Sequence, residues 1–161
     1  MKIIHVQFTK MIYMSRQAME PPVYVYPNIL LGAGAMLTPR FVGEHHITHV
    51  INCAFPENSP AWFRARYPSR YVGLNAIDSN DVKILDWYPK FEETLRRFLR
   101  SPGVGTVFVH CQAGINRSAF LLLYFMTRNF GFDFKTSVKN VRRFRTVCTN
   151  PAFMKEITDT L

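Results

Sequence analysis

The chain has 161 residues, of which 48% are hydrophobic and 14% aromatic, a composition that excludes an intrinsically disordered chain and fits one globular domain. Its formal net charge of +9 attracts phosphoproteins, RNA or anionic membrane surfaces without selecting among them. No apolar run approaches the roughly 20 residues that a membrane-spanning helix needs, so we expect no stable membrane insertion.

The first 20 residues form an N-terminal extension, ahead of a domain that we expect to span residues 21–161. Lys2, His5 and Lys10 interrupt its apolar residues, and no small-residue cleavage site follows, so the extension does not resemble a signal peptide. It is too apolar for a free tail. It either packs on the domain as a helix or edge strand or pairs with a second copy, so that the protein is a monomer or a homodimer.

Short segments with β-strand character recur along the chain, and the residue types at their ends indicate turns and helix starts. The predicted strands are 23–26, 29–31, 47–53, 71–77 and 106–109. Thr38-Pro39 predicts an N-cap and first helical residue, for a short helix that ends near Gly43. Residues 56–68 contain three prolines and are predicted to be a loop.

The second half of the chain carries the helical patterns. Apolar residues at steps of four and three predict an amphipathic helix over about 84–98, which Asp86 would cap and whose first turn would hold Pro89. From Arg117 the chain is apolar on nearly all sides until Gly131, which predicts a central helix ended by glycine. Two more helices are expected around Val138 and after Asn150-Pro151.

Strands that alternate with helices predict an α/β fold. We expect a single domain with a twisted, mixed, mostly parallel sheet of about five strands, flanked by about six helices. In such sheets the ligand binds at the carboxyl ends of the strands.

The most informative segment lies between the last predicted strand and the central helix. It reads His110-Cys111-Gln112-Ala113-Gly114-Ile115-Asn116-Arg117-Ser118. A thiol attacks only as its thiolate, and the unpaired N–H groups of a helix N-terminus favour that anion and also hold phosphate oxygens. Gly114 lets the loop curl, Arg117 can grip two phosphate oxygens, and the Ser118 hydroxyl lies beside the sulfur. We therefore predict Cys111 as a nucleophile toward phosphate and residues 112–117 as the substrate-binding loop.

The loop resembles the signature of the cysteine-dependent protein phosphatases. The sequence around it is similar to the compact dual-specificity branch, including its poxvirus enzymes, over about residues 23–157. The likeness includes residues 28–32, 49–52 and 141–145. It implies a two-step reaction without metal or cofactor: cysteine takes the phosphoryl group from a phosphoprotein, an aspartate protonates the leaving oxygen, and water hydrolyses the thiophosphate. It also implies that His110 orients the loop and supports the thiolate, and that Arg145 lies near the pocket, where it contacts a second phosphate or forms a structural salt bridge.

Two aspartates are candidates for the acid, because Asp78 and Asp81 both follow the fourth predicted strand. The family places an aromatic pair and a proline nine to eleven positions after its acid. Trp87, Tyr88 and Pro89 have that spacing from Asp78, so we choose Asp78. The alternative is that both are turn formers, but an alkoxide is a poor leaving group and a positioned acid accelerates its departure about 10²–10⁴-fold.

The cysteines indicate a reducing environment. Cys53, Cys111 and Cys148 leave one thiol unpaired in any disulfide scheme, so we expect a cytoplasmic protein. Some relatives protect the nucleophile with a disulfide to a cysteine near the position of Cys53, but a free buried thiol is the simpler expectation here.

Three functions are compatible with these features. The first is a dual-specificity phosphatase acting on phosphotyrosine and phosphoserine or phosphothreonine. The second is an RNA 5′-phosphatase or triphosphatase of the same superfamily, which the basic charge would suit. That branch usually differs at Gln112-Ala113 and at Ser118 and lacks the acid. The third is an inactive phosphate-binding module, against which Cys111, Arg117 and Asp78 argue.

Overall fold

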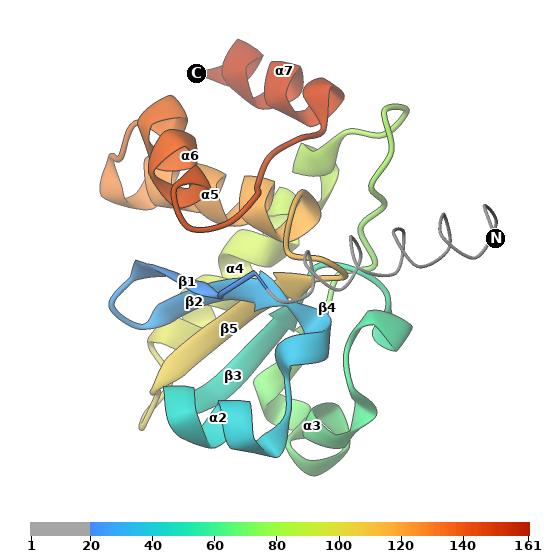
Figure 1. The fold of residues 1–161 in the computed structure, drawn as a ribbon, viewed down its shortest axis with the longest axis vertical. Helices are drawn as coiled ribbons and strands as arrows, with labels where there is room; N and C mark the ends of the chain where they lie inside the picture. The colour runs from blue at the N-terminus through green and yellow to red at the C-terminus, as the bar shows by residue number, and fades with distance from the viewer. Residues whose placement is uncertain (1–19) are drawn as a thin grey trace, which may run out of the picture.

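A five-stranded sheet forms the centre of the computed structural model, which describes residues 20–161 (Figure 1). The strands are β1 (Val23–Tyr26), β2 (Ile29–Ala33), β3 (Ile47–Asn52), β4 (Tyr71–Gly73) and β5 (Thr106–Cys111). Their order in the sheet is β1-β2-β5-β3-β4. Only β1 is antiparallel to its neighbour, and β5 lies in the middle. The predicted mixed, mostly parallel sheet is confirmed.

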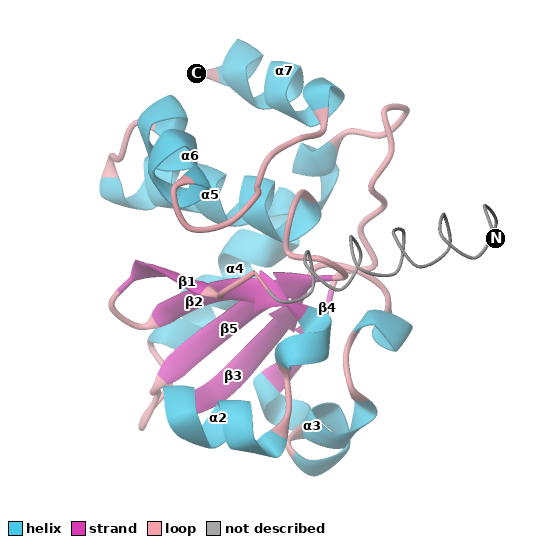
Figure 2. Cartoon of the chain, viewed as in Figure 1, coloured by secondary structure: helices cyan, strands magenta, loops and turns pink. Residues whose placement is uncertain are grey.

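Helices cover both faces of this sheet (Figure 2). They are α2 (Pro39–His45), α3 (Ala61–Arg66), α4 (Tyr88–Leu99), α5 (Arg117–Phe130), α6 (Phe134–Arg142) and α7 (Pro151–Thr160). α2 and α3 lie on one face, and α4 and α5 lie on the other. α6 and α7 pack against α5. The described residues therefore form the predicted α/β domain with six helices.

Alternation along the strands divides the interior into two clusters. Leu30 and Phe108 pack with the residues of α2 and α3, whereas their strand neighbours Leu31 and Val109 pack with α4 and α5. The second cluster is the larger, because α5 is buried on every side from Arg117 to Met126. The helix that follows the candidate loop is thus held rigidly in the core.

Helix ends match the sequence signals at three positions. The Thr38 hydroxyl accepts a hydrogen bond from the backbone N–H of Phe41 and caps α2. Gly131 adopts the left-handed conformation, with φ of 73°, that ends α5. The Asn150 side chain caps α7.

Two local predictions were wrong. Residues 56–68 contain α3, which is stabilised by the buried ring of Phe63 and by a hydrogen bond from the Trp62 indole to the Leu37 carbonyl. The strand predicted over 71–77 ends at Gly73, and Asn75 is left-handed, with φ of 58°. The short helix predicted to end near Gly43 ends two residues later, at His45.

The predicted cap of the amphipathic helix was also wrong. A 3-10 turn over Ile84–Trp87 precedes α4, and Asp86 caps neither element. The N–H groups of Ile84 and Leu85 instead donate to the carboxylate of Glu156 on α7. A carboxylate from a remote helix thus caps the 3-10 turn, and within the described residues α4 itself starts without a side-chain cap.

Between residues 20 and 161, no helix has both the length and the apolar character needed to cross a bilayer. The predicted extension 1–20 lies almost wholly outside the described residues, so its boundary with the domain stays a prediction.

Candidate active site

The sheet places Cys111 at the carboxyl end of its central strand. Cys111 pairs with Ala33 on β2, and the preceding His110 pairs with Asn52 on β3. The chain then turns through residues 112–116 into the first turn of α5. We call residues 111–117 the nucleophile loop. Its sulfur therefore lies between strand ends and below a helix N-terminus, as the sequence predicts.

The carbonyls of the nucleophile loop are turned toward surrounding protein. Those of Gln112 and Ile115 accept from the N–H groups of Gly34 and Cys148, at 3.3 and 2.7 Å. Those of Ala113 and Gly114 accept from Arg145. By contrast, within the described residues no carbonyl or side chain accepts from the N–H groups of residues 112–116. A run of N–H groups without protein acceptors at a helix N-terminus is an anion-binding arrangement.

Glycine is required at position 114 for two reasons. Its φ is +69°, a conformation costly for other residues. A Cβ there would lie 2.4 Å from the Gly32 carbonyl oxygen and 2.9 Å from the Arg145 guanidinium. The loop can therefore pack against the end of β2 only with glycine at this position.

Arg117 has one part of its guanidinium fixed and another unpaired. Nη1 donates to the Ala76 carbonyl at 3.1 Å, while Nε is buried and has no hydrogen-bond partner among residues 20–161. An unpaired buried donor of a charged group costs free energy unless a ligand accepts from it. The predicted phosphate grip by Arg117 remains a prediction, and this geometry suits it.

Cys111 is 3% exposed, and within the described part of the chain its thiol has one polar partner, the Ser118 hydroxyl, which donates to Sγ at 3.2 Å. Cys53 is fully buried close by, and all three cysteines are free. Burial and the negative charge of Cys111 raise the pKa of Cys53 well above its usual value, against the opposing charge of Arg117. Cys53 therefore stays a neutral thiol beside the nucleophile.

His110 is a neutral, oriented ring rather than a titrating one. Burial lowers its pKa to about 4. Nδ1 lies 2.9 Å from the Cys111 carbonyl, which can only accept, so Nδ1 carries the hydrogen. Nε2 then accepts from the Ser59 hydroxyl at 3.1 Å. The ring thus links the loop after β3 to the backbone of the nucleophile, and its role in supporting the thiolate stays a prediction.

This burial predicts a pH dependence of stability. The pKa of His110 is lower in the folded protein than in the unfolded chain. The unfolded chain therefore binds more protons than the folded protein between pH 6.5 and about pH 4. The contribution of the neutral ring to the free energy of unfolding is therefore fully present above pH 6.5 and is lost as the pH falls from 6.5 to about 4. We expect His110→Gln to flatten the dependence, so that wild type loses about 2–3 kcal/mol more than the variant between pH 7.5 and 4.5 in urea denaturation. Equal losses in both proteins would mean that folding does not lower the pKa of His110.

Asp78 is exposed but held at the rim of the loop. Its Oδ2 accepts from the Asn116 side-chain amide at 3.1 Å, and its Oδ1 accepts from that of Asn150 at 2.9 Å. Asp81 is also exposed, and its only polar contact among the described residues is through its backbone N–H, which donates to Ser79. The structure thus connects Asp78, and not Asp81, to the nucleophile loop. The role of either as an acid stays a prediction.

Arg145 was predicted to contact a second phosphate or to form a salt bridge, and its contacts in the structure are of a different kind. It is 2% exposed, and its guanidinium donates to four backbone carbonyls. The acceptors are those of Ala113, Gly114, Glu20 and Pro21, at 2.7 to 3.3 Å. These contacts engage all three nitrogens and four of the five N–H donors, so the buried guanidinium supports the loop through its carbonyls.

Asn116 likewise has its side chain engaged with the protein. Besides donating to Asp78, it accepts from the N–H groups of Thr149 and Asn150, at 2.8 and 2.9 Å. Of the predicted binding residues, Gln112 is exposed and Ala113 and Ile115 are partly exposed.

Sequence reasoning missed two contributors to the site. Ser59 orients His110, and Asn150 reaches Asp78 as well as capping α7. The sequence Asn150-Pro151 predicted a helix cap, but local sequence could not predict that the same side chain also contacts Asp78.

A cysteine at the base of an anion-binding loop, between a parallel strand and a buried helix, defines the class of cysteine-dependent phosphatases. The sequence matches the family described as "Dual specificity phosphatase, catalytic domain" over residues 29–160. The chain belongs to this family.

Individual relatives agree with this assignment. The chain is 29% identical to dual specificity protein phosphatase 19 of Mus musculus over 136 residues, which are 83% of this chain and 59% of that protein. It is 26% identical to dual specificity protein phosphatase 26 of Rattus norvegicus over 154 residues, 94% of this chain and 72% of that protein. The chain therefore spans less than two thirds of the mouse relative.

A solved structure shows the same fold. The chain is similar to a mouse putative dual specificity phosphatase crystallised with zinc tungstate, with a TM-score of 0.72 and 18% identity. The match covers 87% of this chain and 86% of that one.

Proposed function

We propose that this protein hydrolyses phosphotyrosine and phosphoserine or phosphothreonine in phosphoproteins through a cysteinyl-phosphate intermediate. The observation that carries the proposal is the nucleophile loop itself. Its N–H groups at 112–116 and the Nε of Arg117 have no acceptors within the described residues, and they belong to the short loop and first helical residue that follow Cys111 at the carboxyl end of β5. Membership of the dual specificity phosphatase family supports the substrate class.

The first chemical step transfers the phosphoryl group to sulfur. The Cys111 thiolate attacks phosphorus, the S–P bond forms, and the P–O bond to the substrate side chain breaks. Arg117 and the loop N–H groups hold the charged phosphoryl oxygens throughout, which is the main way proteins catalyse such transfers. Asp78 gives its proton to the leaving oxygen, so that an alcohol and not an alkoxide departs.

The second step releases phosphate. Water attacks phosphorus, its proton passes to the Asp78 carboxylate, and the S–P bond breaks. The Ser118 hydroxyl, which donates to Sγ at 3.2 Å, stabilises the sulfur as it regains negative charge. The same aspartate thus serves as acid and then as base.

A direct comparison of substrates tests this proposal. The full chain is offered a phosphotyrosine peptide, a phosphothreonine peptide and RNA with a 5′-triphosphate, and phosphate release is measured. We expect turnover of both peptides, with RNA at least about 100-fold slower. Preference for RNA would replace the proposal with an RNA 5′-phosphatase. Saturable peptide binding without release would leave only a phosphate-binding module.

We further propose a cytoplasmic location, which the three free cysteines support because disulfides are rare in reducing compartments. Phosphoproteins are the proposed partners. The alternatives of a monomer and of a homodimer formed through residues 1–20 concern a segment outside the described residues.

A further inference from the structure

Helix α7 contacts the segment that carries Asp78 at two separate points. The first is Asn150, at the N-terminus of the helix. Its side-chain oxygen accepts from the N–H groups of Ala152 and Phe153, at 2.9 and 3.1 Å, and caps α7. Its amide nitrogen donates to Oδ1 of Asp78 at 2.9 Å. One side chain therefore caps the start of α7 and, together with the Asn116 amide that donates to Oδ2, orients the carboxylate.

The second contact is Glu156, nearly two turns further along α7. Its Oε1 accepts from the N–H of Ile84 at 2.8 Å, and its Oε2 accepts from the N–H of Leu85 at 2.9 Å. These N–H groups belong to the 3-10 turn before α4 and would otherwise lack acceptors. The two oxygens of one carboxylate thus hold the far end of residues 78–85, which we call the acid segment.

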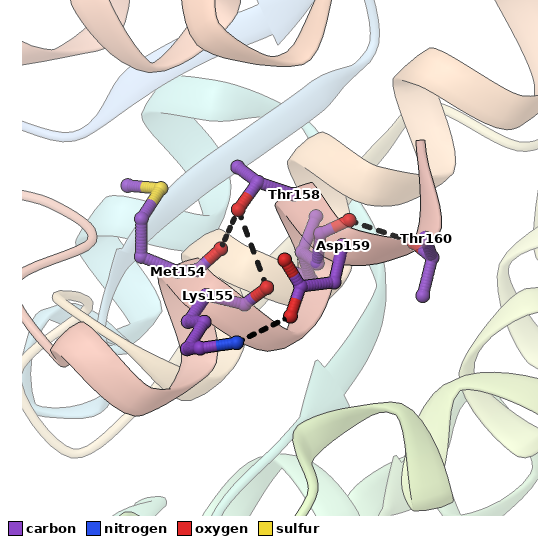
Figure 3. Close-up of polar contacts among 6 residues, drawn as sticks. Met154, Lys155, Thr158, Asp159 and Thr160 are labelled. Carbon is purple, nitrogen blue, oxygen red and sulfur yellow. Dashed lines mark hydrogen bonds and ion pairs between the residues drawn. The ribbon is translucent and has the colours of Figure 1, made fainter.

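Other polar contacts of the α7 side chains stay within the helix (Figure 3). The Lys155 ammonium pairs with Asp159 at 2.7 Å, and the Thr158 hydroxyl donates to the Met154 carbonyl. Among the described residues, Asn150 and Glu156 are the only α7 side chains with hydrogen bonds to the acid segment. The two contacts are therefore specific to that segment, and Asp159 offers a matched control carboxylate on the same helix.

We infer that Asn150 and Glu156 are positioning residues that set the place of the Asp78 carboxyl group and thereby the rate on phosphoserine and phosphothreonine relative to phosphotyrosine. The inference rests on the proposed function, because it takes Asp78 as the acid. Bonds at both ends of the acid segment restrict where its carboxylate can move. Between them Val82 packs against the core, whereas Asn80 and Asp81 are exposed.

The effect of misplacing Asp78 should differ between substrates, because their leaving groups differ in basicity. The phenol of tyrosine has a pKa near 10, so the phenolate is a fairly good leaving group. The alkoxide of serine or threonine is far more basic, so its departure depends more strongly on a proton from the acid. Misplacing a catalytic group by about 1 Å can cost about 100-fold. Loosening the acid segment should therefore slow phosphothreonine turnover strongly and leave a good leaving group, such as 4-nitrophenolate, nearly unaffected.

Two variants isolate the contacts. Asn150→Ser keeps a good N-cap but loses the amide that reaches Asp78. Glu156→Met removes both acceptors and keeps the apolar stem, and Glu156→Gln, which retains one acceptor oxygen, should restore part of the rate. Asp159→Asn is the control, because among residues 20–161 the one polar partner of its carboxylate is Lys155.

The assay measures kcat on a phosphothreonine peptide, a phosphotyrosine peptide and 4-nitrophenyl phosphate, together with thermal unfolding. We expect Asn150→Ser and Glu156→Met to lose about 10- to 100-fold on phosphothreonine and under about threefold on 4-nitrophenyl phosphate. Asp159→Asn should match wild type on all three. Equal losses on every substrate would overturn the inference, since a general effect on the fold or loop would not depend on the leaving group. If Glu156→Met does not fold, Asn150→Ser and Glu156→Gln decide the result.

Asp78→Asn and Asp81→Asn separate this inference from the function on which it rests. Asp78→Asn should show the largest selective loss, Asp81→Asn none, and adding Asn150→Ser to Asp78→Asn no further selective loss. An undiminished phosphothreonine rate in Asp78→Asn would refute Asp78 as the acid in the proposed function. A selective loss on adding Asn150→Ser to Asp78→Asn would instead refute the positioning role, because Asn150 would then act through another group.

Discussion

Replacing Cys111 by serine should abolish turnover while preserving substrate binding. The sulfur lies below a helix N-terminus and accepts from Ser118, a setting that favours an anion, but a serine hydroxyl stays protonated at neutral pH. We expect kcat on a phosphotyrosine peptide to fall roughly 10⁵-fold or more. The N–H groups of the loop and Arg117 are untouched, so the Kd of the peptide should change by less than about threefold. Phosphate release and isothermal titration calorimetry measure the two effects.

The chain provides a matched control in Cys148, which is also buried. Burial raises the pKa of Cys148 to about 12, so its thiol is inert at neutral pH. Cys148→Ala should keep wild-type kcat. Rapid acid quenching of wild type during turnover should also give a peptide that contains Cys111 and one added phosphoryl group. Turnover by Cys111→Ser within tenfold of wild type, or a phosphoryl group found on another residue, would contradict the proposed nucleophile.

The parts of the site that lie together in the sequence were predictable from the sequence. A short apolar strand, a loop with Cys111 and Gly114, and a helix that starts at Arg117 occupy one continuous stretch. Each local preference there agrees with the fold: extended residues before the loop, glycine at positive φ, and an apolar helix in the core. The position of Cys111 at the carboxyl edge then follows from the parallel sheet.

The parts that were not predictable depend on contacts between remote segments. Ser59 meets His110 across 51 residues, and Glu156 meets Ile84 across 72. Local capping rules favoured Asp86, but it caps neither element, and the side chain that does accept from N–H groups here is Glu156, whose helix packs where both of its oxygens reach Ile84 and Leu85. Local sequence patterns predict that a cap is needed, but they do not identify the distant side chain that supplies it.

Arg145 shows the same limit for a charged residue. Its position in the resemblance placed it near the pocket, and this is true of its location: it holds the carbonyls of Ala113 and Gly114 on the side of the loop away from the N–H groups. A guanidinium close to a phosphate site can either bind the phosphate or orient the peptide groups that bind it. Only the hydrogen-bond partners separate these roles, and here all of them are backbone carbonyls.

Removing the Arg145 guanidinium should therefore produce the largest loss of stability among single changes near the site. Arg145→Met keeps the apolar stem but leaves four carbonyls without their donors, each of which costs about 1–3 kcal/mol when buried. Because some of these carbonyls are partly solvated, we expect a loss of about 4 kcal/mol in the free energy of unfolding. For a chain of this length that lowers Tm by about 10 °C, measurable by circular dichroism.

The controls for this variant separate support of the loop from contact with substrate. Arg143→Met removes an exposed arginine two residues away and should change stability by less than about 0.5 kcal/mol. Arg145→Lys keeps the positive charge, but one ammonium cannot replace a planar fork that serves four carbonyls, so it should remain destabilised. If Arg145 bound a second phosphate instead, Arg145→Met would keep its Tm and raise KM only for doubly phosphorylated peptides. A loss of Tm together with reduced kcat on singly phosphorylated peptides follows only if the arginine shapes the loop, because the orientation of the N–H groups that hold phosphate depends on where their carbonyls are fixed.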